Sequence, residues 1–395
     1  MTPAARIAAA IEVLDQVFDG LAAEQALTRW ARGARYAGSK DRAAVRDHVF
    51  QALRCRRSYA ALGGGESGRA VMVGALRADG VDPAMHFTGE GHAPDPLSDD
   101  EEALSAPELS NAQNADLPDW LWHVFQDDLG ADAMAQARAQ RERAPIALRV
   151  NLKMKSVSQA VEMLEKNGVF ASPIEACDTA LIVAEGARKI RQSQAYQTGV
   201  VELQDVSSQC AMARVTVPPR ARVLDYCAGG GGKTLALAAM APEAAEPARF
   251  FAHDIAPGRM ADLPARAARA GVEITVLDAA QINQNGPFDI VICDVPCSGS
   301  GTWRRAPEAK WRLTPERLED IVQNQWDILQ KSCNFLRPGG QLIYTTCSIL
   351  VRENAAQIRA FCGENADDFT LQDDIQMPIS ETGDGFFFAS LLRKN

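Results

Sequence analysis

The chain has 395 residues, of which 47% are hydrophobic and 23% are charged, and its formal net charge is −10. This length exceeds that of one typical domain, and the composition is that of a globular protein rather than a disordered one. No apolar run reaches the roughly 18 residues that a membrane-spanning helix needs. The N-terminal stretch carries acidic residues at helical periodicity instead of an apolar signal core. We therefore predict a cytoplasmic protein of two or three domains without a membrane partner.

The nine cysteines are odd in number, scattered, and without the paired spacing of a zinc site. This distribution argues against a disulfide framework and against a bound metal, and it predicts reduced thiols. The acidic net charge argues against indiscriminate binding of nucleic acid by the whole surface, although local patches must be considered separately.

Apolar residues repeat at helical spacing through the first sixty residues, which predicts a helical domain over residues 1–62. Between Arg29 and Arg57 this segment has nine basic residues and only two acidic ones, in an otherwise acidic chain. We favour a surface that faces nucleic-acid phosphates. The alternative is a set of solvated helix faces on which the arginine stems cover apolar surface.

Residues 63–114 are rich in glycine, proline and acidic residues, which predicts a partly helical linker without chemistry. Helical patterning returns after residue 115, and a strand-like run and a further helix follow. We therefore expect a small α+β substrate-binding subdomain over residues 115–205.

Within residues 206–395, five strand-like runs alternate with helical stretches. Such alternation predicts an α/β domain with a doubly wound, mostly parallel sheet, whose ligands bind at the carboxyl ends of the strands. Asp225, Asp254, Asp278, Asp294 and Cys347 each lie at or just after the end of one run. A late apolar run, Phe-Phe-Phe-Ala-Ser-Leu-Leu-Arg-Lys, predicts a further strand at the edge of the sheet.

A glycine-rich loop, Asp225–Thr234, follows the first of these strands and opens a helix. Its backbone can approach a ligand closely and present N–H groups to it. A Walker A loop would need a glycine where the chain has Cys227, and a dinucleotide fingerprint would need glycine or alanine at Thr234 or Leu235. The loop therefore indicates a nucleotide-like ligand that places no phosphate there.

The next two strand ends carry one acidic residue each, Asp254 and Asp278. A carboxylate at the second strand end can accept hydrogen bonds from both ribose hydroxyls, and one at the third can receive an adenine amino group. Either aspartate alone could instead cap the following helix. Together with the glycine loop they predict an adenosine-containing ligand.

Two cysteines lie beyond late strands, Cys297 in Asp294-Val-Pro-Cys-Ser-Gly-Ser-Gly and Cys347 in Tyr-Thr-Thr-Cys-Ser. A cysteine taken alone is more often a small buried hydrophobe, but both of these lie on the face where ligands bind. Methylation of cytosine at carbon 5 needs such a thiol, because a thiolate must first add to carbon 6 to make carbon 5 nucleophilic. A base must later remove the carbon-5 proton.

Four segments in order make the sequence resemble the RsmB-type, or NOP/Sun, family of S-adenosylmethionine-dependent RNA 5-methylcytosine methyltransferases. The resemblance covers roughly residues 115–394 and implies a class I, Rossmann-like methyltransferase domain. The segments are Cys227–Thr234, matching Cys-Ala-Ala-Pro-Gly-Gly-Lys-Thr, Asp294–Arg312, Tyr344–Leu350 with Glu353-Asn354, and Gly383–Ala389.

The resemblance implies a role for each candidate residue. Cys347 would be the nucleophile, and Cys297 would assist release of the product as a base or a relay. Asp294 would lie near the cofactor and the cytosine edge, and Lys233 would stabilise charge on the target ring. The implied S-adenosylmethionine-binding residues are Cys227, Ala228, Gly229, Gly230, Gly231, Gly232, Lys233, Asp254, Arg259, Asp278 and Asp294.

Gly229-Gly230 departs from the Ala-Pro of the family. Two glycines should make the loop more flexible, at an ordering cost of up to about 1 kcal/mol per residue. We expect weaker cofactor binding rather than inactivity.

The helical N-terminus weakly resembles the NusB-like RNA-binding domain that precedes ribosomal RNA cytosine methyltransferases. We therefore expect 16S ribosomal RNA as the substrate, with transfer RNA second, and a monomer. The Trp303-Arg-Arg and Lys310-Trp-Arg segments could contact and stack on that RNA, or else hold a packed tryptophan. The rival hypotheses are a DNA cytosine methyltransferase that attacks with Cys297, a non-catalytic RNA-binding relative, and a small-molecule methyltransferase.

Overall fold

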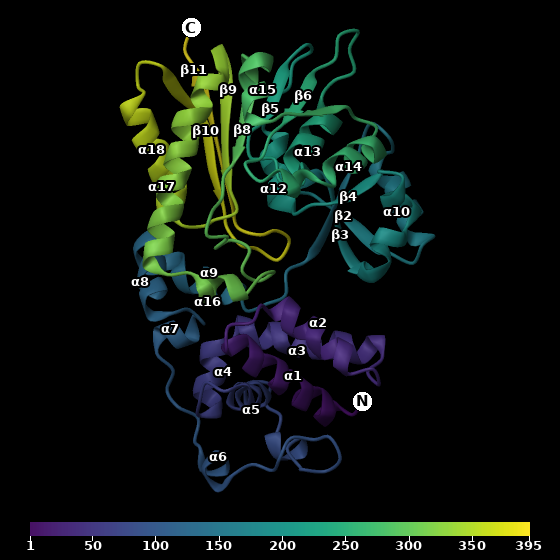
Figure 1. The fold of residues 1–395 in the computed structure, drawn as a ribbon, viewed down its shortest axis with the longest axis vertical. Coiled ribbons are helices and arrows are strands. Elements are labelled where there is room, and N and C mark those ends of the chain that lie inside the picture. The colour runs from purple at the N-terminus through teal and green to yellow at the C-terminus, as the bar shows by residue number, and fades with distance from the viewer. The chain divides into compact units, whose positions relative to one another are not determined.

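A computed structural model describes residues 1–395 and divides into two compact units (Figure 1). The first unit comprises Met1–Arg143 together with Trp303–Pro315. The second unit comprises Ala144–Thr302 and Glu316–Asn395. None of the helices combines the length and the apolar character that crossing a membrane would require.

The first unit is built from helices only. Apolar residues on one face of the first helix, such as Ile7, Ala10 and Leu14, are buried in its core, as the helical spacing predicts. The α-helices are α1 (Pro3–Phe18), α2 (Ala23–Gly33), α3 (Ser39–Arg54), α4 (Arg56–Gly63), α5 (Gly68–Ala78), α6 (Asp99–Ala103), α7 (Asn111–Asn114), α8 (Asp119–Leu129), α9 (Ala133–Ala139) and α16 (Glu308–Arg312), with short 3-10 helices η1 (Pro83–Met85) and η2 (Gly130–Asp132).

The helical unit does not end at residue 62, which corrects the predicted boundary. Helix α5 lies in the segment that we expected to be a linker, yet it belongs to the same core as α1 and α3. Helices α4 and α5 approach so closely that a Cβ on Gly63 would lie 1.8 Å from the carbonyl oxygen of Ala70. Only glycine permits this contact. Helices α8 and α9, which lie within the predicted subdomain of residues 115–205, pack with this helical unit, and the first strand of that subdomain begins at Ile146.

The Trp303–Pro315 segment is packed inside the helical unit, so the prediction that Trp303 offers a stacking surface to RNA is wrong. Trp303 is 1% exposed and stacks on Phe125, with 6.0 Å between the ring centroids. Lys310 is also buried and donates a hydrogen bond to the carbonyl of Arg54 at 2.8 Å. Burial lowers the pKa of Lys310 to about 8. These side chains complete a core instead of facing a ligand.

The second unit begins with a four-stranded antiparallel sheet in the order β2-β3-β1-β4. Its strands are β1 (Ile146–Val150), β2 (Phe170–Ile174), β3 (Cys177–Glu185) and β4 (Val201–Leu203), with helices α10 (Val157–Glu165), η3 (Ala187–Gln192) and α11 (Gln194–Gln197). This is the small α+β arrangement that the sequence predicts around the run Ile146–Val150 and the following helix.

The larger sheet has seven strands in the order β10-β11-β9-β8-β5-β6-β7. Strands β9, β8, β5, β6 and β7 are parallel, and β11 and β10 are added antiparallel. The strands are β5 (Arg222–Asp225), β6 (Arg249–Ala252), β7 (Ile274–Val276), β8 (Phe288–Asp294), β9 (Leu336–Thr346), β10 (Phe369–Met377) and β11 (Phe386–Arg393).

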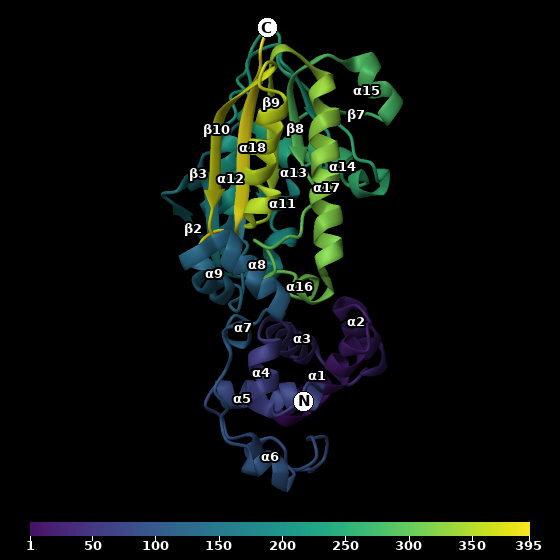
Figure 2. The same ribbon diagram turned by 90° about the vertical axis from the view of Figure 1, so that its left-hand side faces the viewer.

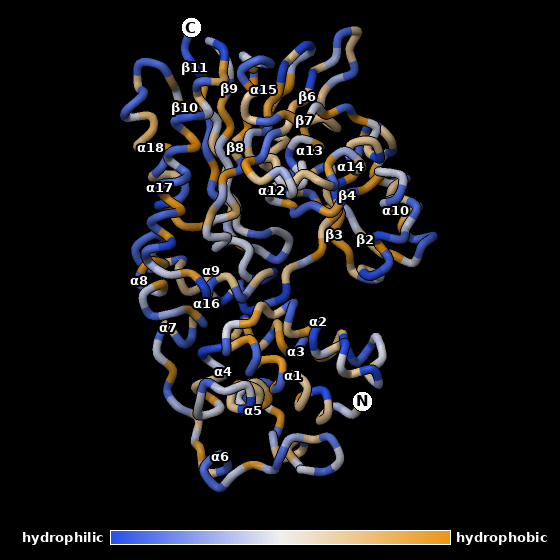
Figure 3. Tube along the Cα trace, viewed as in Figure 1, coloured by the Kyte–Doolittle hydropathy of each residue, from blue (hydrophilic) through white to orange (hydrophobic).

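Helices cover both faces of this sheet, because its central strands are apolar on both sides. On β8, Ile290 and Ile292 belong to one buried cluster, and Val291 and Cys293 belong to the cluster on the opposite face. Figures 1 and 2 show α17 and α18 beside one face, and Figure 3 shows apolar residues concentrated along the strands. The helices are α12 (Val206–Ala213), α13 (Gly232–Met240), η4 (Pro257–Met260), α14 (Leu263–Ala270), α15 (Ala279–Asn285), α17 (Pro315–Ser332), η5 (Cys333–Phe335), η6 (Val351–Glu353) and α18 (Ala355–Glu364).

The predicted fold class, an α/β domain with a doubly wound, mostly parallel sheet, is confirmed. One detail differs. The late apolar run forms β11, which lies between β9 and β10 and is buried over most of its length, whereas the edge is formed by the more polar β10. A strand made of a continuous apolar run is buried most completely when it has a neighbouring strand on each side, as β11 has.

We predict that Trp303→Ala destabilises the helical unit by about 3–5 kcal/mol, because it leaves a cavity against Phe125. The unfolding of the protein in urea, followed by circular dichroism of its helices, measures this change. Trp303→Phe is the matched control, since it keeps an aromatic ring in the core. An unchanged unfolding midpoint for Trp303→Ala, combined with weaker RNA binding, would instead support a surface stacking role.

Candidate active site

The glycine loop joins β5 to α13 and has the backbone geometry that its glycines allow. Gly229 and Gly231 have φ angles of +49° and +76°, which side-chain-bearing residues rarely adopt. Beneath the loop, the fully buried Asp225 accepts a hydrogen bond from the Thr234 hydroxyl at 2.6 Å. Burial raises the pKa of Asp225 to about 6. This bond ties the end of β5 to the first turn of α13.

Asp254, just beyond the end of β6, holds the same loop. One of its carboxylate oxygens accepts the N–H of Gly229 at 2.9 Å and pairs with Arg259 at 3.1 Å, while the other accepts the N–H of Ala256 at 2.9 Å. The oxygen that accepts from Ala256 has a second lone pair that a ribose hydroxyl could use. The glycine loop and the neighbouring carboxylate thus fit an adenosine-containing cofactor.

The other predicted cofactor residues contribute in different ways. Asp278, beyond β7, is exposed and caps α15 by accepting the N–H of Gln281 at 2.9 Å, as the capping interpretation of this residue expected. Cys227, within the loop, is partly buried, and burial raises its pKa. Ala228 is buried, and its N–H donates to the carbonyl of His253 at 2.9 Å.

The structure brings the two candidate cysteines together. Cys297 follows β8 and Cys347 follows β9, which are adjacent parallel strands, and their sulfur atoms are 3.3 Å apart. The pKa of Cys347 is lowered, mainly because the Cys297 thiol donates a hydrogen bond to it. The Lys233 charge and a hydrogen bond from Thr302 also lower this pKa, whereas burial and the charge of Asp294 raise it. The same contact and burial raise the pKa of Cys297. Cys347 is therefore the better thiolate of the pair.

Lys233 and Asp294 form an ion pair beside these thiols. The Nζ of Lys233 lies 2.5 Å from one carboxylate oxygen of Asp294, and the other oxygen accepts the Thr345 hydroxyl at 3.1 Å. Burial works against the Lys233 ammonium, but the charge and hydrogen bond of Asp294, together with Cys347, raise the pKa of Lys233. A fixed cation is thus held next to the Cys347 thiolate.

A buried carboxylate, Glu353, connects the two cysteine-bearing loops. It is 0% exposed, and its oxygens accept the N–H and hydroxyl of Ser298, at 2.7 and 2.5 Å, and the hydroxyl of Ser348 at 2.5 Å. The amide of Gln325 adds a fourth hydrogen bond at 3.0 Å. Ser298 follows Cys297 and Ser348 follows Cys347. One carboxylate therefore sets the separation of the two thiols.

Further contacts lock the same two loops together. The Ser300 and Ser348 hydroxyls are 2.8 Å apart, and the N–H of Gly301 donates to the carbonyl of Cys347 at 2.9 Å. Asn354 accepts the Thr346 hydroxyl at 2.6 Å and donates to the carbonyl of Ser348 at 2.9 Å. Sequence reasoning quoted Glu353-Asn354 as part of a motif but assigned it no role. The sequence does show a serine after each of the two cysteines, and two such hydroxyls are potential hydrogen-bond donors to a nearby carboxylate.

No group of three or more histidine, cysteine, aspartate or glutamate side chains is placed to hold a metal ion.

We predict that replacing Lys233 by methionine raises the pKa of Cys347, because the thiolate loses its neighbouring cation while the Asp294 charge remains. The pH dependence of Cys347 alkylation by iodoacetamide, followed by peptide mass spectrometry, gives this pKa directly. In the unmodified protein the inflection should lie below that of an ordinary thiol. Lys233→Arg keeps the charge and should keep the inflection near its original position. An inflection in Lys233→Met at or below the original pH would contradict this assignment.

Comparisons with known proteins identify the family. Residues 214–392 match the family model described as 16S rRNA methyltransferase RsmB/F, and residues 117–189 match the model of the Methyltr_RsmF/B-like, ferredoxin-like domain. The chain is 31% identical over 289 residues to ribosomal RNA small subunit methyltransferase B of Escherichia coli O6:K15:H31, which covers 70% of the chain and 66% of the relative.

It is also 31% identical over 307 residues to ribosomal RNA small subunit methyltransferase B of Citrobacter koseri, which covers 74% of the chain and 70% of the relative. The chain thus spans about two thirds of the length of these relatives. In fold, it resembles the crystal structure of PH0851 with a TM-score of 0.77 and 23% identity, over 99% of both chains. The chain therefore belongs to the RsmB/F family of S-adenosylmethionine-dependent 16S rRNA methyltransferases.

Proposed function

We propose that this protein methylates carbon 5 of a cytosine in 16S ribosomal RNA through a covalent bond between Cys347 and the base. The observation that carries the proposal is the pair of thiols 3.3 Å apart beside the Lys233–Asp294 ion pair. A small-molecule or nitrogen-directed methyltransferase has no chemical need for a thiolate nucleophile, whereas carbon-5 chemistry needs one nucleophile and one proton acceptor, roles that two adjacent thiols can divide.

The first step needs a thiolate, and the site favours one at Cys347. Its sulfur adds to carbon 6 of the cytosine and forms a carbon–sulfur bond, while the electron pair of the carbon 5–carbon 6 double bond moves into the ring and makes carbon 5 nucleophilic. Lys233 stabilises the negative charge that develops on the ring, and Asp294 keeps the Lys233 ammonium in place. S-adenosylmethionine supplies the methyl group that carbon 5 takes.

The second step restores the aromatic ring and frees the enzyme. Loss of the carbon-5 proton returns an electron pair to the carbon 5–carbon 6 bond, and the carbon–sulfur bond breaks with its electrons returning to Cys347. Cys297, whose sulfur lies 3.3 Å from that of Cys347, assists as the base or as a relay for the proton. Glu353 acts as a positioning residue, because it holds both cysteine loops at this separation.

RNA is proposed to contact the helical unit through part of the basic cluster that the sequence showed. Six of its nine basic residues are exposed, and five of these have no ion pair, namely Arg29, Arg32, Arg35, Lys40 and Arg42. Arg54, Arg56 and Arg57 instead serve the unit itself, through a hydrogen bond to the Arg304 carbonyl, an aromatic contact with Phe18 and an ion pair with Asp119. The exposed Tyr36 adds an aromatic ring beside the free arginines.

We predict that Cys347→Ala abolishes covalent trapping on RNA that carries 5-azacytidine, because the attacking thiol is gone. Cys297→Ala should still form the adduct with 5-azacytidine, and on RNA with ordinary cytosine it should accumulate the covalent adduct because release is slowed. Denaturing gel electrophoresis with labelled 16S rRNA, transfer RNA and DNA measures the adduct and names the preferred nucleic acid. Trapping that survives in Cys347→Ala and is lost in Cys297→Ala would assign the nucleophile to Cys297. Absence of methyl transfer to any of the three would favour the non-catalytic RNA-binding alternative.

We predict that the triple variant Arg29→Gln, Arg32→Gln and Arg35→Gln binds RNA more weakly. The slope of log binding constant against log salt concentration should become shallower by an amount equal to about three phosphate contacts, since each contact releases counterions. Binding to 16S rRNA fragments and to transfer RNA at several salt concentrations measures the slope. A triple variant at the exposed Arg220, Arg249 and Arg337, which lie at or next to the amino ends of β5, β6 and β9 and so away from the carboxyl-end site, is the control. An unchanged slope in the first variant would show that this surface does not face RNA.

A further inference from the structure

We propose that Arg266, fixed by Glu202, is the positioning residue that orders the cofactor-binding loop of this chain, in place of the proline that the family carries at position 230. This inference rests on the cofactor site proposed above. The loop has two consecutive glycines where the family motif has Ala-Pro, so it lacks the restraint that a proline ring imposes. Some other interaction must order the backbone if the cofactor is to meet a preformed loop.

Arg266 supplies such an interaction. Its side chain rises from α14, and one guanidinium nitrogen donates a hydrogen bond to the carbonyl of Gly230. The remaining guanidinium nitrogens donate to one carboxylate oxygen of Glu202 at 2.8 and 2.5 Å. Charge-assisted hydrogen bonds to Glu202 fix the orientation of the Arg266 guanidinium. The guanidinium can therefore restrain the position of the Gly230 carbonyl to which it donates.

Glu202 is itself held firmly. Its side chain is 5% exposed, and it accepts a second ion pair from Arg269, whose guanidinium lies 4.5 Å from the centroid of the Tyr196 ring. A carboxylate shared by two arginines in a nearly buried position costs much more to disturb than a surface pair. Arg266 is therefore anchored to the small sheet through β4 rather than free to sample solvent.

The sterics of position 230 connect this anchor to the missing proline. Gly230 does not adopt a positive φ angle, so its own backbone conformation does not call for glycine. A Cβ at this position would lie 2.8 Å from the Arg266 guanidinium nitrogen. A proline or alanine at 230 would therefore require the Arg266 guanidinium to move away from the Gly230 carbonyl, whereas glycine leaves room for this contact.

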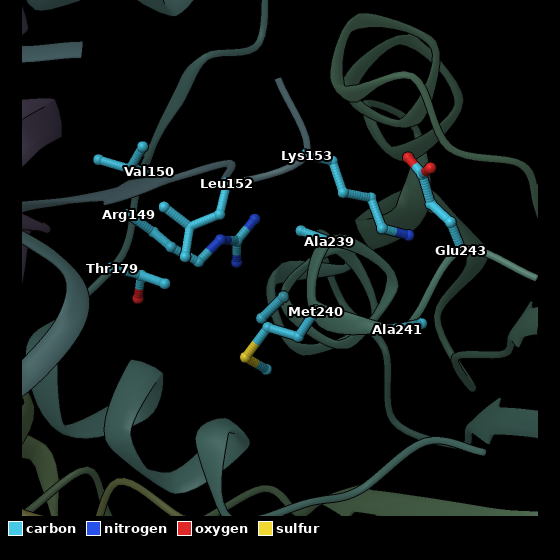
Figure 4. Close-up of a pocket in the computed structure, with 10 residues that line it drawn as sticks. Arg149, Val150, Leu152, Lys153, Thr179, Ala239, Met240, Ala241 and Glu243 are labelled. Carbon is cyan, nitrogen blue, oxygen red and sulfur yellow. The ribbon is translucent and has the colours of Figure 1, made fainter. Parts of the chain in front are cut away.

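The opposite side of the loop is held in the same manner. Arg149, directly opposite Glu202 in the β1–β4 pair, is 4% exposed and donates to the carbonyl of Gly232 at 3.0 Å. Lys153 donates to the carbonyl of Ala238 further along α13 at 2.8 Å. Figure 4 shows both side chains close to Ala239 and Met240 at the end of α13. Arg149 and Lys153 line a cavity of about 360 Å³ there. The small sheet thus reaches the loop and the helix behind it through Glu202, Arg149 and Lys153.

The test is a double-mutant cycle between positions 266 and 230. Arg266→Ala should raise the dissociation constant for S-adenosylmethionine about tenfold, and Gly230→Pro should also raise it, because the proline displaces the guanidinium. The double variant should bind within about threefold of the original protein, since the proline then restrains a loop that has no arginine to collide with. Effects that simply multiply in the double variant would overturn the proposal.

A second readout does not involve the cofactor. Hydrogen exchange of the Gly229–Gly232 amides in the ligand-free protein should accelerate in Arg266→Ala. It should also accelerate in Glu202→Gln, which removes the carboxylate partner of Arg266 and leaves the arginine itself unchanged. Exchange should slow again in the double variant Arg266→Ala with Gly230→Pro. Arg214→Ala, which removes a two-point ion pair with Asp373, is the matched control and should leave both readouts unchanged. Unaltered loop exchange in Arg266→Ala would overturn the proposal. Failure of the unaltered protein to bind S-adenosylmethionine would refute the proposed cofactor site, while the exchange measurement would still decide the role of Arg266.

Discussion

The buried carboxylate of Glu353 is the constraint on which the rest of the site depends. All four of its hydrogen bonds come from neutral donors, three of them from the serines that follow the two reactive cysteines. Burying such a group is costly unless its acceptors are satisfied, so the cysteine loops can move apart only by leaving a carboxylate without partners. The 3.3 Å separation of the thiols is thereby tied to the stability of the core beneath them.

The charged and polar neighbours of the two thiols then give Cys297 and Cys347 different pKa values. The Lys233 ammonium and the Cys297 thiol lower the pKa of Cys347, whereas the same thiol contact and burial raise the pKa of Cys297. Asp294 opposes this by its charge, but it also holds the Lys233 cation in place and raises the pKa of that lysine. Chemically similar cysteines therefore acquire different pKa values from their surroundings, which suits a reaction that needs one nucleophile and one proton carrier.

The small sheet has a role in the same chemistry. Through Glu202 and Arg149 it grips two carbonyls of the glycine loop, one by way of Arg266 and one directly. A subdomain that the sequence suggested only as a substrate-binding part is thus also a support for the cofactor loop. Loop order in this chain comes from long-range ion pairs rather than from a locally restrained residue.

The sequence by itself determined the alternating strands and helices, the glycine loop, the strand-end acids and the order of the family motifs, because each of these is a local pattern of a few residues or of one period. Only the tertiary structure decided which of nine basic residues are exposed, that Trp303 is core, that α5 belongs to the helical unit, and that Glu353 joins loops whose contacts span 55 positions of the chain. Burial and pairing depend on segments that are distant in the chain and adjacent in the fold. A local sequence pattern therefore cannot predict which distant segments pack together or which side chains they bury.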